Sequence, residues 1–421
     1  MGLRIDAQPL PGHQISVEQQ HRMSVDGLLP SKIMHPADAE DAARGLRLCD
    51  LTPAAVVIWG GGTQMRLGSH PQRYDIAFST ERMTRLLEYE PADLTCRVEA
   101  GMRLVELQKT LHAQGQRLPL EPPHPDRATV GGMVAANSHG LSRARHGTVR
   151  DWVIGIAVAY PSGKVARAGG RVVKNVAGYD LMKLHTGALG TLGLIAEVNL
   201  KVQTLPESAL SVLAHFDDAG KALTAGRALA HQYLAPAASI LLDRSSLWAC
   251  GVTADWRWTL ALKFEGHARE VDAARENAEG IIRGAGGCLE GQSVPARFWE
   301  VARDWAASPA DDEVVLSGLA PLTGLEKLVL GGAPLGSLMA QPAAGALDIR
   351  VPAEAAASAL ERLRQAAGSE GQVIVGSAPP AAKKSLDVWG RPPAAFPLMR
   401  SLKQALDPNA TLNPGRFVGG L

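Results

Sequence analysis

Three glycine-rich segments, each beside a stretch with strand character, constrain this 421-residue chain more than any other feature. The first is Gly-Gly-Gly-Thr at residues 60–63, directly after the apolar run 55–59. Glycine adopts positive φ angles without a steric penalty, so successive backbone N–H groups can turn toward one anion. Neither the G-x-G-x-x-G pattern of a Rossmann fold nor a Walker A motif is present. The segment therefore predicts either a pyrophosphate-binding nest or a plain glycine turn.

The second segment, TVGGMVAANSHG, covers residues 129–140 and is followed by three arginines at Arg143, Arg145 and Arg150. Its paired glycines would let a loop backbone approach a ligand closely. The arginines could bind a phosphate or a substrate carboxylate, or they could be exposed side chains. The segment therefore predicts a second ligand-binding loop with a basic flank.

The third segment carries glycines at 187, 190 and 193, three residues apart, so a regular helix through them is disfavoured. It predicts a loop whose backbone faces a flat ligand, or a simple connection between a helix at 179–185 and a strand at 194–202. The three segments together are much more specific than any one of them, because they lie within 135 residues and each adjoins a strand.

Hydrophobic periodicity predicts an α+β fold. In the first half, we expect helices at 36–48 and 104–112, and strands at 55–59, 95–99, 152–159, 164–168 and 192–202. In the Ala-rich second half, we expect strands at 209–215, 258–264 and 346–351 that alternate with helices at 218–231, 268–283 and 353–367. A last helix is expected at 398–406, before the turn signals Asp-Pro and Asn-Pro-Gly.

A chain of 421 residues is longer than one hydrophobic core supports, so at least two domains are expected. We predict a loosely ordered extension at 1–25, a first domain at 26–206 and a second at 207–385. A C-terminal segment at 386–421 should return to the first domain. Pro206 and the pair Pro379-Pro380 are candidate hinges.

Composition excludes several classes of protein. The 43 basic and 42 acidic residues balance, so electrostatics gives no reason to expect nucleic acid or an anionic membrane as partner. No apolar run approaches the roughly 18–20 residues of a membrane span, and no signal peptide is recognisable, so we expect a cytoplasmic protein without direct membrane insertion.

Four scattered cysteines favour a reducing compartment and argue against an iron–sulfur cluster or zinc ribbon within the chain. These are Cys49, Cys96, Cys250 and Cys288.

In their order and spacing, the three glycine segments resemble those of FAD-linked oxidases of the vanillyl-alcohol oxidase / p-cresol methylhydroxylase (PCMH) type. The ending Leu-Asp-Pro…Leu-Asn-Pro-Gly-Arg at 406–416 resembles the C-terminal motif of that superfamily. Within it, segments 87–95, 98–101 and 169–180 are similar to the family of FAD-binding (E) subunits of bacterial glycolate oxidase. The resemblance is strong over 26–206, good over 386–417 and weak between. It implies a two-lobed PCMH-type FAD-binding domain plus a cap domain with an antiparallel sheet covered by helices.

The resemblance also implies which residues bind FAD. The first segment would hold the pyrophosphate, the second would line the diphosphate and ribityl region, and the third would contact the flavin. The positions carried over are Gly60, Gly61, Gly62, Thr63, Gln64, Thr129, Gly131, Gly132, Ala135, Asn137, Gly190, Thr191 and Ile195. Some family members attach FAD covalently through a histidine at the first loop. Here Gln64, Met65 and Arg66 follow Thr63, so we expect non-covalent FAD.

One departure from the superfamily bears on catalysis. Its D-2-hydroxy-acid dehydrogenases carry a metal motif, H-x-G-D-G-N-x-H, in the C-terminal part. This chain has no histidine after His267, so that motif is missing and we expect no metal site. The glycolate oxidase E subunits resemble this chain in lacking it.

Oxidation of a 2-hydroxy acid such as glycolate to the 2-oxo acid needs a cation for the carboxylate and a base for the hydroxyl proton. The candidate cations are Arg143, Arg145 and Arg150, and the candidate bases are His139, His146 and His185; the catalytic residues stay open.

The resemblance implies partner subunits: an iron–sulfur subunit that takes the electrons, and a flavoprotein subunit with the metal motif. Any contact with the inner membrane would come through them. Two alternatives remain, a stand-alone D-lactate (D-2-hydroxy-acid) dehydrogenase and a non-catalytic subunit in which FAD is structural.

Overall fold

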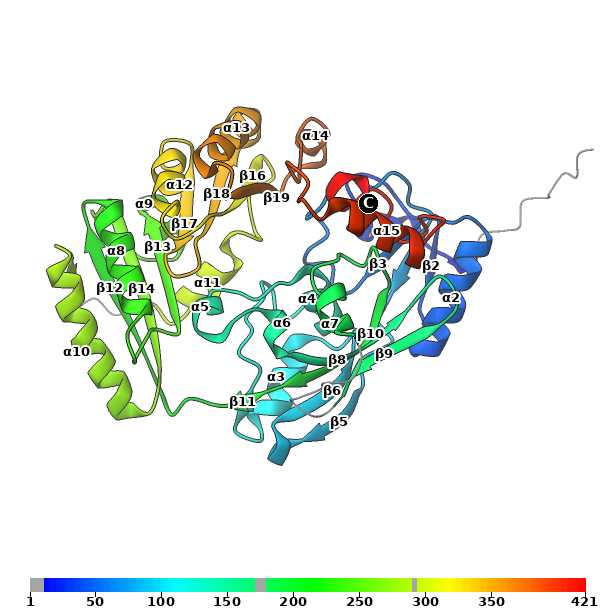
Figure 1. Ribbon diagram of the computed structural model, residues 1–421, viewed down its shortest axis with the longest axis horizontal. Coiled ribbons are helices and arrows are strands. Elements are labelled where there is room, and N and C mark those ends of the chain that lie inside the picture. Colours follow the sequence, from blue (N-terminus) through cyan, green and yellow to red (C-terminus); the bar gives the residue numbers. More distant parts are fainter. Residues whose placement is uncertain (1–10, 171–178, 290–293) are drawn as a thin grey trace, which may run out of the picture.

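The computed structural model describes residues 11–170, 179–289 and 294–421, and its mixed α+β architecture is the predicted one (Figure 1). Two small sheets and their helices form one half of the molecule. A single large sheet covered by helices forms the other. Residues 171–178 of the motif at 169–180, and residues 1–10 and 290–293, lie outside the described residues.

The first lobe is a four-stranded sheet in the order β1-β2-β4-β3, in which β2, β4 and β3 run parallel. Its central strand is buried along its whole length, as expected for parallel strands covered on both faces. Helix α2 covers it because Asp38 caps the helix N-terminus and Ala42 and Leu46 form a buried stripe. The elements are β1 (His13–Gln14), α1 (Val17–Arg22), β2 (Lys32–Met34), α2 (Ala39–Leu51), β3 (Val56–Trp59) and β4 (Ile76–Ser79).

Residues 11–25 belong to the expected loosely ordered extension at 1–25, and the structure gives them defined elements. Ser16 forms a capping box with Gln19 at the start of α1, and Met23 and Val25 are buried against Trp59 and Tyr74. Buried apolar side chains anchor only the end of this segment, since α1 itself has no buried residue, and no long apolar run in the sequence signals it.

The second lobe is an antiparallel sheet in the order β5-β6-β10-β8-β9, with a two-stranded pair β11-β7 beside it. Its strands are β5 (Leu86–Glu90), β6 (Thr95–Glu99), β7 (Gln116–Arg117), β8 (Val153–Ala159), β9 (Val165–Gly169), β10 (Leu194–Lys201) and β11 (Gln203–Thr204). Its helices are α3 (Leu104–His112), α4 (Val130–Ala136), α5 (Arg143–His146), α6 (Val149–Trp152) and α7 (Leu181–His185). The strands β6, β8, β9 and β10 and the helix α3 lie where the periodicity predicted them, whereas β5, β7 and β11 were not predicted.

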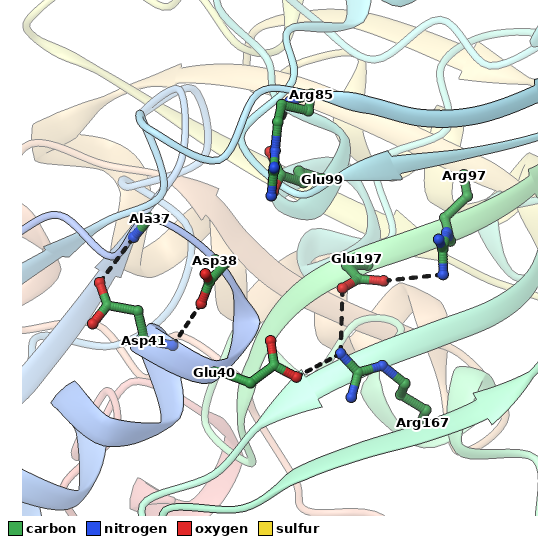
Figure 2. A network of polar contacts seen from close by, with 9 residues as sticks. All are labelled: Ala37, Asp38, Glu40, Asp41, Arg85, Arg97, Glu99, Arg167 and Glu197. Atoms are coloured by element: carbon green, nitrogen blue, oxygen red, sulfur yellow. Dashed lines mark hydrogen bonds and ion pairs between the residues drawn. The ribbon is translucent and has the colours of Figure 1, made fainter.

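A network of ion pairs joins the two lobes (Figure 2). Arg167 on β9 binds Glu40 in the first turn of α2 at 2.8 Å and Glu197 on β10 at 3.5 Å. Arg97 on β6 lies 3.7 Å from the other oxygen of Glu197. Because Arg167 and Glu40 are half exposed, each pair contributes roughly 1 kcal/mol or less, and the network chiefly orients one lobe on the other.

The cap domain is an eight-stranded antiparallel sheet in the order β15-β12-β14-β13-β17-β18-β16-β19. Its strands are β12 (Ser208–Phe216), β13 (Ala238–Asp243), β14 (Trp258–Gly266), β15 (Cys288–Leu289), β16 (Glu313–Leu319), β17 (Ser337–Gln341), β18 (Ala346–Pro352) and β19 (Gln372–Ser377). Its helices are α8 (Ala219–Ala230), α9 (Arg244–Ala249), α10 (Ala268–Gly284), α11 (Phe298–Trp305), α12 (Leu325–Gly332) and α13 (Ala356–Ala367).

Strand alternation gives this sheet two different faces. Leu241 packs with α8, α10, α12 and α13 on one face, whereas its neighbours Ile240 and Leu242 pack with α9 and α11 on the other. Leu141 from the first domain packs into this second cluster, so the second face meets the first domain.

After the cap sheet comes the short helix α14 (Pro380–Lys383), and the C-terminal segment with α15 (Phe396–Leu406) then runs back over the first lobe (Figure 1). Leu412 forms a parallel bridge to Val56, and the side-chain oxygen of Asn413 accepts a hydrogen bond from Ile58 N at 3.1 Å. The boundaries at 206 and 385 stay predictions. Among the described residues, no helix is long and apolar enough to cross a bilayer.

Candidate functional site

The triple-glycine turn begins where β3 ends. Within the described part of the chain, none of the backbone N–H groups of residues 60–65 donates a hydrogen bond to protein. Gly62 has φ +72°, and a Cβ on Gly61 would lie 1.7 Å from the Arg127 carbonyl oxygen, so only glycine fits there. A row of unpaired N–H groups is what an anionic phosphate group can satisfy.

The second segment differs from expectation, because residues 130–136 form the helix α4 and not a loop. Thr129 caps the helix by accepting a hydrogen bond from Gly132 N at 3.2 Å. Gly131 is tolerated in the helix because it packs directly on Ala100, where a Cβ would come within 2.5 Å of the alanine Cβ. Gly131 therefore allows α4 to pack closely on Ala100, the residue that follows β6.

The third segment is the predicted loop, between α7 and β10. Gly190 has φ +68°, and a Cβ there would lie 2.8 Å from the side-chain nitrogen of Asn413. That nitrogen donates a hydrogen bond to Leu189 O at 2.6 Å, so the C-terminal segment fixes the loop.

The three segments meet around one cavity. Of the thirteen residues carried over as cofactor ligands, those on its wall are Gly60, Gly61, Gly62, Thr63, Gln64, Thr129, Gly131, Gly132, Ala135, Gly190 and Ile195. Thr191 does not line it: the side chain is buried and donates a hydrogen bond to Ala188 O at 2.7 Å. Asn137 lines an adjoining cavity instead. The wall residues that sequence reasoning missed are Ile58, Met65, Thr80, Ala100, Ala136, Leu189, Gly193, Asn413 and Arg416.

Arg416 is the charged residue on that wall, and it is buried. Its Nη2 donates hydrogen bonds to Met65 O at 2.9 Å and to Leu67 O at 2.5 Å. Its Nη1, also buried, has no partner among the residues that the structure describes. Burial lowers the pKa of Arg416, an effect that the nearby Asp26 opposes. A cationic nitrogen without a partner, next to unpaired backbone N–H groups, fits a cofactor that carries phosphates.

A second cavity, of about 940 Å³, opens between the first domain and the cap, and Ala136 and Leu189 line both cavities. Asn137 and Arg143 line it from the first domain. The side-chain oxygen of Asn137 is buried and has no partner within the described ranges. A ligand here would have a cation and a free hydrogen-bond acceptor beside it, next to the first cavity.

The three candidate arginines lie in different environments. Arg143 lines the second cavity, whereas Arg145 donates a hydrogen bond to Ala235 O and Arg150 is exposed to solvent. Burial lowers the pKa of Arg143, and Asp348 on the cap sheet opposes that effect. Burial raises the pKa of Asp348, which accepts a hydrogen bond from Ser317 Oγ at 2.6 Å. Sequence reasoning missed Asp348 because nothing local marks a carboxylate on an interior strand.

None of the three candidate histidines lines either cavity. His139 binds the Asn137 carbonyl oxygen through Nδ1 at 2.8 Å, and His185 shares a hydrogen bond of 2.8 Å with the Tyr160 hydroxyl. Burial lowers the pKa values of His139, His146 and His185 to about 4, so all three are neutral at pH 7. In the described residues, no group of three or more His, Cys, Asp or Glu side chains could hold a metal ion.

Comparison with known families gives two matches. Residues 30–169 match the model of the FAD binding domain, and residues 205–378 and 388–417 match the C-terminal domain of FAD linked oxidases.

Individual relatives agree with these families. Glycolate oxidase subunit GlcE of Escherichia coli is 30% identical over 391 residues, 89% of this chain and 95% of that protein. Subunit GlcD of Bacillus subtilis is 27% identical over 300 residues, 70% of this chain but only 63% of that protein. D-lactate dehydrogenases are also among the similar proteins.

The fold matches solved structures. The crystal structure of p-cresol methylhydroxylase superimposes with a TM-score of 0.72 at 14% identity, and the match covers 96% of this chain and 93% of that one. At this identity the likeness concerns the fold alone, and it confirms the predicted PCMH-type architecture with its cap.

Proposed function

The chain belongs to the family of FAD-linked oxidases that includes the glycolate oxidase subunits, and we propose that it is the FAD-binding subunit of a glycolate dehydrogenase complex. The observation that carries this proposal is the similarity to GlcE, which extends over 95% of that subunit's length. The missing metal motif agrees with it, since this chain has no histidine after His267.

The proposed cofactor site is the first cavity, with FAD held non-covalently. Its support is the row of unpaired N–H groups at residues 60–65 and the unpartnered Nη1 of Arg416. The loop residues Gln64, Met65 and Arg66 include no histidine that could form a covalent link. When bound, FAD supplies the two-electron acceptor for the substrate.

The proposed substrate site is the second cavity, because it adjoins the first at Ala136 and Leu189. Arg143 would bind the carboxylate of glycolate or another 2-hydroxy acid, since guanidinium groups pair with carboxylates through two parallel hydrogen bonds. Asn137 would orient the hydroxyl group by accepting a hydrogen bond from it. Conversion of the 2-hydroxy acid to the 2-oxo acid removes two electrons and two protons.

Asp348 is our candidate for a residue that positions Arg143. It lies on the cap sheet within the electrostatic reach of Arg143, although it does not itself line either cavity. Ser317 Oγ donates a hydrogen bond to one of its carboxylate oxygens at 2.6 Å. The group that takes the hydroxyl proton stays unassigned.

We further propose that the electrons leave through partner subunits of a cytoplasmic complex: an iron–sulfur subunit, and a flavoprotein subunit that carries the metal motif. Two of the similar proteins are subunits of glycolate oxidase, which supports a multi-subunit assembly.

The deciding experiment is anaerobic titration of the purified chain, loaded with FAD, with glycolate and separately with D-lactate. Bleaching of the flavin by glycolate supports the proposal, and the Asp348→Asn variant should then reduce more slowly at unchanged FAD content. Bleaching by D-lactate alone would favour the stand-alone dehydrogenase. An unreduced flavin in the isolated chain, with turnover only in the assembled complex, would assign FAD here a relay or structural role.

A further inference from the structure

The loop that follows the triple-glycine turn is held through three consecutive carbonyl groups. Arg416 Nη2 donates hydrogen bonds to Met65 O and Leu67 O. The carbonyl between them, Arg66 O, accepts a hydrogen bond from Lys383 Nζ at 2.7 Å. Two cations from the C-terminal part of the chain therefore fix the backbone that carries Gly62, Thr63 and Gln64 into the proposed FAD site.

One buried carboxylate, Asp26, pairs with Lys383 and lies near Arg416. Lys383 Nζ lies 2.8 Å and 3.0 Å from the two carboxylate oxygens of Asp26, and the two side chains are 0% and 2% exposed. Asp26 also acts electrostatically on Arg416. An ammonium group this deeply buried is retained only with a close counter-charge and satisfied hydrogen bonds, and Asp26 together with Arg66 O supplies both.

Lys383 is the last residue of α14, which follows the cap strand β19 after two residues. The cap and the cofactor loop are therefore linked by one short, charged connection, at the hinge that Pro379-Pro380 marks in the sequence.

We infer that Asp26, Lys383 and Arg416 form a clamp that holds residues 62–67 in the FAD-binding conformation, so that FAD affinity depends on the seating of α14, the short helix that follows the cap sheet. Lys383 and Asp26 act as positioning residues, because they reach the loop from behind and neither lines the cavity. Arg416 has two roles, since one of its nitrogens holds the loop and the other is unpartnered beside the cavity. The inference rests on the proposed FAD site but not on the identity of the substrate.

The test is FAD affinity, measured on the full chain by fluorescence titration without any substrate. The double variant Asp26→Asn/Lys383→Met removes both buried charges while keeping similar volumes, a replacement that buried ion pairs often tolerate. Thermal unfolding and circular dichroism establish that it is folded. We expect its Kd for FAD to rise at least about tenfold, which corresponds to ~1.4 kcal/mol.

The matched control is Arg117→Met/Glu265→Gln, which removes another ion pair between the first domain and the cap, away from the glycine loop. Its FAD affinity should stay within about twofold of the unmodified chain.

Three results would overturn the inference. An unchanged FAD affinity in the folded clamp variant would do so, as would an equal loss in the control. If the double variant does not fold, the single variant Asp26→Asn, which removes the carboxylate charge but leaves an amide oxygen to accept a hydrogen bond from Lys383, must show the tenfold loss. Failure of the unmodified chain to bind FAD would instead overturn the cofactor site itself, and the clamp with it.

Discussion

At the scale of single residues, Arg143 differs from Arg145 and Arg150 in where its side chain lies, although all three are arginines. It is partly buried on the wall of the second cavity, whereas Arg150 is exposed. A charge-assisted hydrogen bond contributes about 1.5–3 kcal/mol. We therefore expect Arg143→Met to raise KM for the 2-hydroxy acid at least about tenfold, with the FAD content unchanged. Steady-state kinetics of the assembled complex provide the measurement.

Two further variants test whether the guanidinium group of Arg143, and its position, are required. Arg143→Lys should recover only part of the loss, because an ammonium group cannot make the paired, planar contact of a guanidinium. Arg150→Met is the matched control and should leave KM unchanged. Equal effects of Arg143→Met and Arg150→Met would show that overall charge, and not a specific contact, governs substrate binding.

At the scale of elements, the turn after β3 should tolerate no side chain. A Cβ on Gly61 would lie 1.7 Å from Arg127 O, and one on Gly60 would lie 2.3 Å from Thr129 Oγ1. Because Arg127 O is backbone, relief requires movement of the turn itself. We expect Gly61→Ala to abolish measurable FAD binding and to lower the melting temperature of the chain.

Gly280→Ala is the appropriate control for that substitution. Gly280 lies inside α10, and a Cβ there has nothing within 4 Å. It should raise stability slightly, by about 0.5–1 kcal/mol, because alanine favours the helix, and it should leave FAD binding unchanged. Normal flavin binding by Gly61→Ala would contradict the role assigned to the turn.

These elements also show what a sequence can and cannot predict. The glycine turn and the strand before it were predictable because both signals are local: an apolar run and residues that permit positive φ. The helix α4 was missed because Gly131 and Gly132 have poor helix propensity, which packing on Ala100 and the Thr129 cap override. Arg416 and Lys383 could not be assigned, since their partners lie more than 300 residues away in sequence.

At the scale of the whole molecule, polar contacts hold the cap on the first domain. Arg117 on β7 pairs with Glu265 on β14 at 2.5 Å, and Lys263 lies 2.7 Å from the same glutamate. Lys263 also reaches Glu121 in the first domain at 3.4 Å. Glu265 is only 7% exposed, so its charge matters more to docking than a surface pair would.

Acid should therefore loosen this docking. Burial alone would raise the pKa of Glu265, but hydrogen bonds from Arg117 and Lys263 outweigh it and lower the pKa to about 2, below the ordinary 4.5. A carboxyl group whose pKa is lowered on folding stabilises the folded state above its unfolded pKa. That stabilisation, up to about 3 kcal/mol here, disappears as pH falls from about 4.5 toward 2.

We accordingly expect Glu265→Gln to unfold at a lower temperature than the unmodified chain at pH 7, and the difference to shrink as pH falls below about 4.5. Thermal unfolding of both proteins between pH 7 and pH 3 measures it. Glu300→Gln removes an exposed pair with Arg297 and should change little at any pH. A difference between Glu265→Gln and the unmodified chain that stays constant across this range would mean that Glu265 acts through packing, and that its charge does not hold the cap in place.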